Sequence, residues 1–381
     1  MARPEFDVIV AGAGAGGAAA ACYLTRAGLR VLVVERARLP RYKACGGAIP
    51  RPVLERLPFA LDGVVRAAPG QVRLTFPGMT PVDLPLHDQP VVMVMRSEFD
   101  AFLLDHAGAE VLQDCDLTGV EEDDHGVRVQ AGARKLHARY LVGADGAASR
   151  VAQSLGLRRD RRLCGTLEAE IPRNGGTLGA EDGSRAVFAL GALPWGYAWI
   201  FPKGEFLSVG IAQLRPGRAD LRSALHHEMG RQGISLEGQK LHGHPLPCYQ
   251  APAWPWWQSR AQEPIATKRC LLVGDAAGLV DPLLGEGIRY ALGSARLAAE
   301  AIARDDLSGY ETAIWREIGH SLATAGMTAR LYYRWPKLSY RLGLSNPTTG
   351  RQFIDLLTEK TSYQGIARRM MGAAVHRFLG R

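Results

Sequence analysis

Short apolar segments rich in β-branched residues recur along the first part of the chain, separated by small residues. Residues 7–11 and 29–34 are two such segments, and the glycines beside them are typical of the ends of short buried strands. Residues 18–24 between them continue as an apolar helix that Gly28 ends. A strand, a helix and a second strand in this order predict a βαβ unit.

Two later segments repeat the combination of an apolar strand and a glycine turn. Residues 140–146 and 270–278 each lead from an apolar run into a Gly-flanked acid, Asp145 in the first and Asp275 in the second. We expect both acids at the carboxyl ends of strands in one sheet, where open α/β sheets bind ligands.

Aromatic residues alternate with smaller ones at Tyr197, Trp199 and Phe201. A strand with this alternation presents all three rings on one face. Such rings most often belong to a core, and the alternative is a wall for an apolar ligand.

Composition bounds the class of protein. The chain has 381 residues, 47% of them hydrophobic and 22% charged, which excludes disorder and fibrous repeats and suggests two or three domains. None of the six cysteines forms a C-x-x-C pair, so a zinc ribbon, an iron–sulfur cluster or a disulfide scaffold is disfavoured. His242 and His244 lack a third ligand in view, and we expect no metal. The start of the chain lacks the basic segment of a signal peptide, and we expect a cytoplasmic protein.

The net charge of +8 is concentrated at the C-terminal end. Residues 316–381 hold 11 Lys+Arg and 3 Asp+Glu, with Tyr332, Tyr333, Trp335 and Tyr340 interleaved. Two interpretations stay open, a solvated basic face and a contact with anionic lipid on the inner face of the membrane. Nucleic acid is disfavoured because no recognition motif accompanies the charge.

The first predicted strand leads into a phosphate-binding pattern. Gly12, Gly14 and Gly17 follow it in G-x-G-x-x-G spacing, and Glu35 ends the second strand. The glycines allow a tight turn, a close backbone approach to a pyrophosphate and helix packing, while the acid suits the adenosine ribose. This spacing alone fits NAD or FAD. The two later Gly-flanked acids favour FAD, because the long flavin nucleotide needs contacts from distant parts of the chain.

Three segments resemble one known family. Residues 41–50 (RYKACGGAIP) are similar to the K-x-C-G-G-A-I-P signature of the geranylgeranyl reductase family, within the flavoproteins of the hydroxybenzoate-hydroxylase fold. Residues 197–203 with 209–210 are similar to its Y-x-W-x-F-P-K…V-G segment, and residues 274–288 to its third cofactor motif. The resemblance runs from about residue 6 to about residue 305.

The resemblance assigns expected roles to several residues. It places residues 41–50 near the isoalloxazine ring, where Gly46 and Gly47 would allow close approach to flavin or substrate. Cys45 is then a candidate proton relay, the alternative being a small buried residue that shapes the pocket. Arg96 matches the position of a cofactor-facing arginine, and a surface charge at a helix end is the alternative.

The expected site residues are therefore these. The candidate catalytic residues are Cys45, Tyr197 and Trp199. The candidate cofactor-binding residues are Gly12, Gly14, Gly17, Glu35, Arg36, Cys45, Gly46, Gly47, Arg96, Asp145, Gly146, Gly274, Asp275, Gly285, Gly287 and Ile288.

The implied function is an FAD-dependent reductase that saturates C=C bonds of a polyprenyl chain by hydride transfer with matched protonation. The chain has one dinucleotide motif, so NADPH would visit transiently or ferredoxin would deliver electrons. The alternatives are an FAD-dependent monooxygenase or halogenase on the same scaffold, and a non-catalytic flavin-binding protein.

The expected fold class is α/β (α+β), with a Rossmann-type FAD-binding domain, a β-sheet substrate domain and a helical C-terminal region. The expected FAD-binding domain is discontinuous and comprises residues 1–65, 90–160 and 262–308. The expected substrate domain comprises residues 66–89 and 161–261, and the basic helical region residues 309–381.

Overall fold

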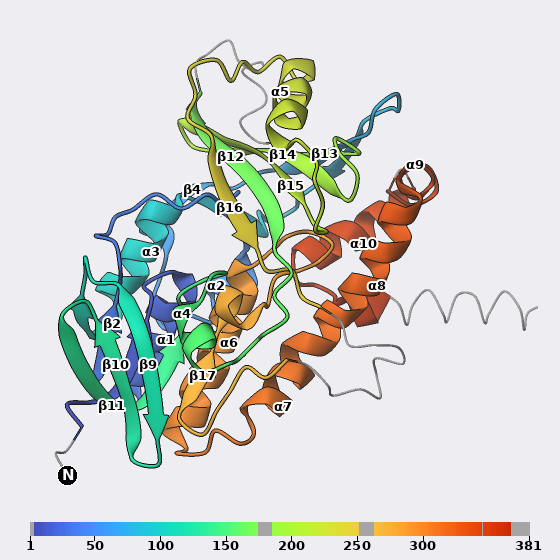
Figure 1. The fold of residues 1–381 in the computed structure, drawn as a ribbon. Coiled ribbons are helices and arrows are strands. Elements are labelled where there is room, and N and C mark those ends of the chain that lie inside the picture. The colour runs from blue at the N-terminus through green and yellow to red at the C-terminus, as the bar shows by residue number, and fades with distance from the viewer. Residues whose placement is uncertain (1–3, 174–184, 251–262, 345, 367–381) are drawn as a thin grey trace, which may run out of the picture. The chain divides into compact units, whose positions relative to one another are not determined.

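The computed structural model describes residues 4–173, 185–250, 263–344 and 346–366 (Figure 1). The chain forms two compact units. The first unit comprises residues 1–43, 95–164 and 245–320, and the second comprises residues 44–94, 165–244 and 321–381. Both mix helices and sheets, which confirms the expected fold class.

The first unit is built on a mixed sheet in the order β8-β2-β1-β11-β10-β9, with β17 also paired to β11. Its strands are β1 Phe6–Ala11, β2 Val31–Val34, β8 Glu110–Leu112, β9 Leu117–Asp123, β10 Gly126–Ala131, β11 Arg134–Gly143 and β17 Cys270–Leu272. Its helices are α1 Ala15–Arg26, α3 Arg96–Asp105, α4 Arg150–Ser154, η3 Gly274–Ala277, α6 Ile288–Ala303, α7 Tyr310–Ile314 and η4 Trp315–Gly319.

The predicted βαβ unit is confirmed, since β1 pairs in parallel with β2 through α1. The apolar runs before Asp145 and Asp275 also form strands, β11 and β17, which pair in parallel with each other. Helix α1 carries so little charge because most of its residues are buried, and its alanines and glycines allow close packing against α6. Within the described residues, no helix is long and apolar enough to cross a bilayer.

The second unit contains a sheet in the order β16-β12-β15-β14-β13-β5-β6 and a small sheet in the order β3-β7-β4. Its strands are β3 Ala48–Pro50, β4 Val65–Ala67, β5 Gln71–Thr75, β6 Val82–Pro85, β7 Val91–Val94, β12 Cys164–Pro172, β13 Arg185–Leu190, β14 Gly196–Lys203, β15 Phe206–Gln213 and β16 His242–Leu246. Its helices are α2 Arg51–Leu54, η1 Asp62–Val64, α5 Leu221–Arg231, α8 His320–Arg334, α9 Pro336–Ser339, η5 Tyr340–Leu344 and α10 Pro347–Leu357.

The large sheet of the second unit has two different faces. On one face, Ala198 and Ile200 of β14 lie in an aliphatic core with Leu225 and Met229 of α5. The other face of β14 carries aromatic and charged side chains that are also buried, which is unusual for a sheet.

The two units differ from the expected boundaries in several places. Residues 44–65 lie in the second unit, because β3 and β4 pair with β7 there. The C-terminal helices from residue 321 also belong to the second unit, because the Tyr340 hydroxyl donates hydrogen bonds to the carbonyl oxygens of Leu74 and Thr80. Residues 367–381 of the expected basic region lie outside the described residues.

Candidate functional site

The register of the first sheet explains why several predicted site residues gather at one edge. Ala11 at the end of β1 pairs with Val34 of β2 and with Gly143 of β11, and Gly143 pairs with Leu272 of β17. These four parallel strands end together, so the segments that follow them share one edge of the sheet. Ligands of open α/β sheets bind at such an edge.

The first and third glycines of the motif are required by the backbone. Gly12 has a φ of +99°, a conformation that side chains disfavour, and a Cβ there would lie 3.1 Å from the Asp145 Cα. A Cβ on Gly17 would overlap the Gly12 carbonyl oxygen, so the first turn of α1 packs directly on the strand end. The tight turn and the close packing predicted from the spacing are confirmed.

The second glycine faces a group of cations instead. A Cβ on Gly14 would lie 3.7 Å from Nη2 of Arg41 and 3.9 Å from Nη2 of Arg96. Gly14 is the N-cap of α1, with no side-chain cap and no acid in the first turn of the helix. Free N–H groups at a helix start together with two guanidinium groups form a site that suits an anion.

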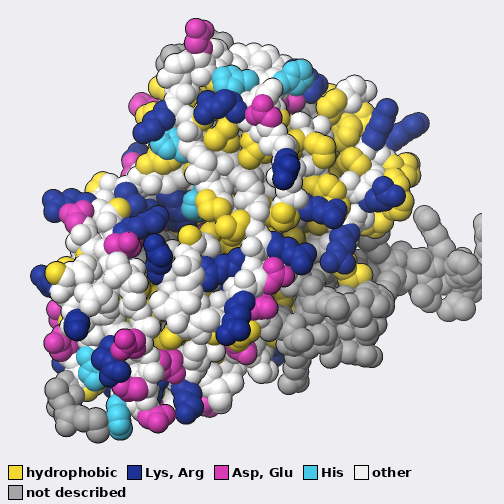
Figure 2. Space-filling view, in the orientation of Figure 1, with side chains coloured by type: hydrophobic (Ala, Val, Ile, Leu, Met, Phe, Trp, Pro, Cys, Tyr) yellow, Lys and Arg dark blue, Asp and Glu magenta, His cyan; other side chains and the backbone are white. Residues whose placement is uncertain are grey.

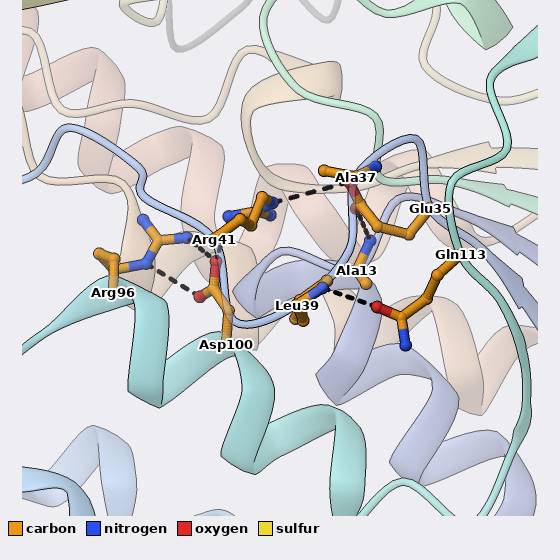
Figure 3. Close-up of polar contacts among 8 residues, drawn as sticks. All are labelled: Ala13, Glu35, Ala37, Leu39, Arg41, Arg96, Asp100 and Gln113. Carbon is orange, nitrogen blue, oxygen red and sulfur yellow. Dashed lines mark hydrogen bonds and ion pairs between the residues drawn. The ribbon is translucent and has the colours of Figure 1, made fainter.

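Asp100 holds both guanidinium groups in place (Figure 3). Arg96 donates from Nε and Nη2 to the two oxygens of Asp100, at 2.9 and 2.8 Å, and Arg41 donates from Nη1 to Oδ2 at 3.1 Å. Asp100 is fully buried and Arg96 is only 4% exposed. The alternative interpretation of Arg96 as a surface charge is therefore wrong.

Glu35 is fixed against the glycine turn. Its Oε2 accepts a hydrogen bond from the Ala13 N–H at 2.7 Å, and its Oε1 accepts from the Ala37 N–H at 3.1 Å (Figure 3). The carboxylate is buried and lies 3.6 Å from Nε of Arg41. Arg36, the next residue, is exposed. The acid and the phosphate turn therefore form one connected structure.

Only one of the two carboxylate oxygens of Asp145 has a hydrogen-bond partner among the described residues. Its Oδ2 accepts hydrogen bonds from the N–H groups of Arg150 and Val151 at the start of α4. Its Oδ1 is buried and has no hydrogen-bond partner among the described residues. Burial raises the pKa of this carboxyl, against the opposing effect of its hydrogen bonds. Gly146 follows it in an open position, where a Cβ would meet no atom within 4 Å.

Asp275 lies in the short helix η3 that follows β17. Lys43 forms an ion pair with it at 3.7 Å, and a Cβ on Gly287 would lie 3.3 Å from its Oδ1. Gly274, at the start of this turn, donates its N–H to the Ser294 hydroxyl at 3.0 Å. The Asp275 turn and the start of α6 are thereby held together.

The loop before α6 is organised by its own acid. The buried Asp281 accepts hydrogen bonds through Oδ1 from the N–H groups of Leu283 and Leu284, at 2.7 and 3.0 Å. Its backbone carbonyl accepts from the N–H of Gly285 at 2.9 Å. The loop leads directly into α6, whose first residue is Ile288.

A buried arginine supports the Asp275 turn and was missed by the sequence analysis. Arg158 donates from Nη1 to the carbonyl oxygens of Asp275 and Ala276, both at 3.3 Å. Burial lowers the pKa of this guanidinium to about 10. Gly278 leaves the space that the guanidinium fills, since a Cβ there would overlap it. No sequence motif marks Arg158, because its partners are backbone atoms far along the chain.

The second unit holds Cys45 on a tight turn. The half-buried Cys45 accepts a hydrogen bond through Sγ from the Gly47 N–H at 3.4 Å, and its carbonyl oxygen accepts from Nζ of Lys203 at 2.8 Å. Gly47 has a φ of +74°, and a Cβ there would overlap the Val94 carbonyl oxygen. The turn is therefore rigid, and Lys203 fixes its position.

The predicted aromatic face is confirmed next to this turn. Tyr197, Trp199 and Phe201 lie in sequence along β14, with ring centroids 6.2 and 6.4 Å apart, and each is at most 7% exposed. A Cβ on Gly46 would lie 2.9 Å from the Phe201 ring and 3.5 Å from the Trp199 indole nitrogen. The structure thus brings Cys45, Tyr197 and Trp199 into one neighbourhood.

Two sets of buried polar contacts link β14, which carries these rings, to other strands of the sheet. The Trp199 indole N–H donates to the Ser208 hydroxyl at 3.0 Å, which donates to Oε1 of Glu168 at 2.8 Å. Lys203, whose side chain is fully buried, pairs with Glu170 at 2.9 Å. Buried polar groups in such chains fix side-chain positions, because leaving one unpaired is costly.

Comparison with known proteins gives the family. The chain matches the family model described as an FAD binding domain over residues 5–305. A geranylgeranyl diphosphate reductase of Rhodobacter capsulatus is 31% identical over 310 residues, covering 78% of this chain and 75% of that protein. A menaquinone reductase of Mycobacterium tuberculosis is 30% identical over 330 residues, covering 79% of this chain and 78% of that protein.

Solved structures share the fold. A geranylgeranyl bacteriochlorophyll reductase-like protein of Thermoplasma acidophilum has a TM-score of 0.74 at 22% identity, covering 93% of this chain and 91% of that chain. A flavin-dependent brominase has a TM-score of 0.71 at 19% identity, covering 98% and 99% of the two chains. The fold therefore occurs in proteins with different chemistry. The family match and the relatives at 30% identity or more show that this chain belongs to the geranylgeranyl reductase family of FAD-dependent oxidoreductases.

Proposed function

We propose that this protein is an FAD-dependent reductase that saturates C=C bonds in a polyprenyl chain. The observation that carries the proposal is the buried aromatic face of β14, which lies against the rigid turn of Cys45. An apolar chain suits such a face, and a thiol at its edge is a chemically suitable proton donor. The relatives named geranylgeranyl diphosphate reductase support the same substrate class.

The residues of the first unit fit FAD. The N–H groups at the start of α1, together with Arg41 and Arg96, would hold its pyrophosphate, because the space beside Gly14 is lined by cationic donors. Glu35 would accept from the adenosine ribose. The orphaned Oδ1 of Asp145 would accept from a ribityl hydroxyl, which removes the cost of a buried oxygen without a partner. When bound, FAD supplies the hydride chemistry of the reaction.

The turn that carries Asp275 and the start of α6 would extend the proposed cofactor site. Asp275 would be the second acid of this site, and Lys43 forms an ion pair with its carboxylate. The N–H groups at the start of α6, beside Gly285, Gly287 and Ile288, would stabilise negative charge on the flavin. Arg158 would act as a positioning residue, because it donates hydrogen bonds to the backbone carbonyl oxygens of the Asp275 turn.

The second unit would orient the substrate and manage the proton. Hydride addition to an isolated trisubstituted alkene leaves positive charge at the more substituted carbon, which the ring faces of Tyr197 and Trp199 would stabilise. Cys45 would hold the proton at Sγ, within reach of the Gly47 N–H that stabilises sulfur after the proton leaves. Burial of the rings keeps water from competing for the same carbon.

Apolar contacts readily supply affinity for the polyprenyl chain, but they do not fix the position of that chain along the aromatic face. Each buried CH₂ contributes about 0.8 kcal/mol, so a chain of about twenty carbons offers well over 10 kcal/mol gross. A shift by one isoprene unit presents nearly the same shape to the aromatic face. Contacts with the head group must therefore set which double bond reacts. We propose NADPH or ferredoxin as the transient source of electrons, since the chain carries one dinucleotide motif.

An anaerobic stopped-flow experiment tests the proposal. The purified holoenzyme is reduced with dithionite under nitrogen and mixed with geranylgeranyl diphosphate, and the absorbance of oxidised flavin is followed. We expect the absorbance to return with the prenyl substrate and to stay low with a saturated analogue. Return only on admission of oxygen, with a hydroxylated or halogenated product, would establish the monooxygenase or halogenase alternative instead.

The role of Cys45 is tested separately with Cys45→Ser and Cys45→Ala. We expect both variants to retain flavin, because its proposed phosphate contacts lie in the first unit. Turnover should fall further in Cys45→Ala than in Cys45→Ser, since a hydroxyl still carries a proton. Full turnover in Cys45→Ala would remove the proton role.

A further inference from the structure

The last helices of the described chain expose an unusual set of apolar side chains. Five large hydrophobic residues between positions 327 and 342 are exposed to solvent: Met327 by 37%, Leu331 by 62%, Trp335 by 53%, Leu338 by 52% and Leu342 by 65%. Single exposed apolar residues are ordinary on protein surfaces, whereas a contiguous set indicates a binding surface.

The exposed apolar residues come from three consecutive elements. Met327 and Leu331 lie four positions apart on α8, Trp335 lies at the break before α9, Leu338 lies on α9 and Leu342 on η5; we call these five residues the apolar face. Buried residues of the same segment anchor it in the second unit: the Tyr333 ring stacks on Trp195 with centroids 5.5 Å apart, and Tyr340 is hydrogen-bonded to Leu74 and Thr80. The apolar face is thus held outward by the fold.

Cations border the apolar face, and their own stretch of sequence contains no acid. Arg330, Arg334, Lys337 and Arg341 are all exposed, and the sequence contains no Asp or Glu between Glu317 and Asp355. The Arg334 guanidinium lies over the Trp335 ring, 5.8 Å from its centroid. Figure 2 shows yellow side chains with dark blue ones around them at the upper right, where α9 lies in Figure 1.

We propose that the apolar face with its four cations docks on the surface of an anionic lipid bilayer. Leu and Trp side chains suit the boundary between headgroups and acyl chains, and cations beside them suit anionic headgroups. A second copy of the same face fits poorly, because it would bring four cations against four cations. The inference rests on the proposed function in one respect, namely that a polyprenyl substrate resides in lipid.

Vesicle sedimentation of the FAD-loaded full chain tests the surface. The probes are substrate-free vesicles of phosphatidylcholine alone and of phosphatidylcholine with phosphatidylglycerol. We expect binding to the anionic vesicles and at least tenfold weaker binding to the neutral ones. Equal binding to both would overturn the anionic part of the proposal, and no binding to either would overturn all of it.

Two sets of substitutions test the residues. Glutamate at Arg330, Arg334, Lys337 and Arg341 should weaken binding to anionic vesicles by roughly a hundredfold or more. The matched control makes the same charge change at the exposed Arg134, Lys135, Arg218 and Arg222 and should weaken it far less. Equal losses in the two sets would mean that only total charge matters, which overturns the proposed surface.

The apolar residues are tested by Leu331→Ser together with Leu342→Ser. We expect at least tenfold weaker binding to anionic vesicles. Unchanged binding would contradict insertion of the apolar face. Sedimentation velocity gives a second test. A wild-type protein that is dimeric, with a double variant that is monomeric, would also contradict the proposal, because the apolar face would then be an interface between copies.

Turnover separates this inference from the proposed function. With dissolved geranylgeranyl diphosphate, all of these surface variants should reduce the prenyl chain at the wild-type rate. Wild-type protein that binds vesicles but reduces no prenyl substrate would leave the surface standing and refute the proposed function. A surface variant that binds vesicles normally but loses turnover would contradict the docking role.

Discussion

The glycine turn of the first unit and the aromatic face of the second reach rigidity in different ways. Around Gly12 and Gly17 the backbone itself makes the contacts, so any added side chain atom collides with main chain. Around Trp199 and Lys203, rigidity comes from side-chain pairs between different strands of one sheet. A site for an invariant phosphate group can be built from backbone, whereas an apolar substrate face needs side chains that are held in place.

The largest expected effect follows from filling the glycine turn. In Gly17→Ala the new Cβ overlaps the Gly12 carbonyl oxygen, so either α1 or β1 must move. We expect a loss of about 4 kcal/mol or more in the free energy of unfolding, with little FAD retained on purification. Thermal unfolding and flavin absorbance measure both effects.

The matched control is Gly230→Ala in α5, where a Cβ meets no atom within 4 Å. It should be neutral or stabilise the protein by up to about 1 kcal/mol, because alanine favours helix. A Gly17→Ala protein as yellow and as stable as Gly230→Ala would contradict the backbone account.

The next effect concerns the second unit. Lys203→Met leaves the Glu170 carboxylate and the Cys45 carbonyl without their buried donor, which should cost about 3 kcal/mol of stability. The double variant Lys203→Met with Glu170→Gln should recover part of that loss. Chemical denaturation measures both proteins, and a single variant as stable as the double would show that the pair is not coupled.

A smaller effect is expected at the phosphate cations. Arg96→Met removes one guanidinium beside Gly14 and should weaken FAD binding by roughly tenfold to a hundredfold, as loss of a charged hydrogen bond does. Arg38→Met, an exposed arginine paired with Asp114, should leave FAD affinity unchanged. Titration of the apoprotein with FAD compares the two, and equal affinities would remove Arg96 from the proposed site.

The smallest effect is a pH dependence. Burial raises the pKa of Asp145 in the folded protein above its unfolded value, so its contribution to stability is greatest at low pH and is lost as pH rises through the folded pKa. Asp145→Asn should remove this loss and still accept from the Arg150 N–H. Unfolding curves of both proteins from pH 4 to 7 measure it as the difference in stability between wild type and Asp145→Asn, and a difference that shifts in favour of wild type as pH rises would contradict the expected direction.

Most of the first unit could be predicted from sequence because its constraints are local. The βαβ unit, the phosphate turn and the strand ends before Asp145 and Asp275 each follow from a short run of residues. Asp100 was not predicted as the partner of Arg96, although its i,i+4 spacing on one helix could have indicated the pair.

The second unit was less accessible to prediction. The alternation of Tyr197 and Trp199 predicts their common face. The buried polar pairs on the same sheet depend on strand register, which the alternation does not give. Lys203 meets Glu170 from two strands, β14 and β12, that are not adjacent in the sheet. The anchoring of Tyr340 on Leu74 spans 266 residues, and no local pattern marks it.

The proposed function requires this chain to reduce an alkene that is held on its aromatic face. The most direct test is the mass of the prenyl product after a single anaerobic turnover of the reduced holoenzyme, with wild type compared against Trp199→Ala. We expect a product that has gained two hydrogens and no oxygen or halogen, in much lower yield with Trp199→Ala. A prenyl chain of unchanged mass under nitrogen, modified only when oxygen is admitted, would contradict it.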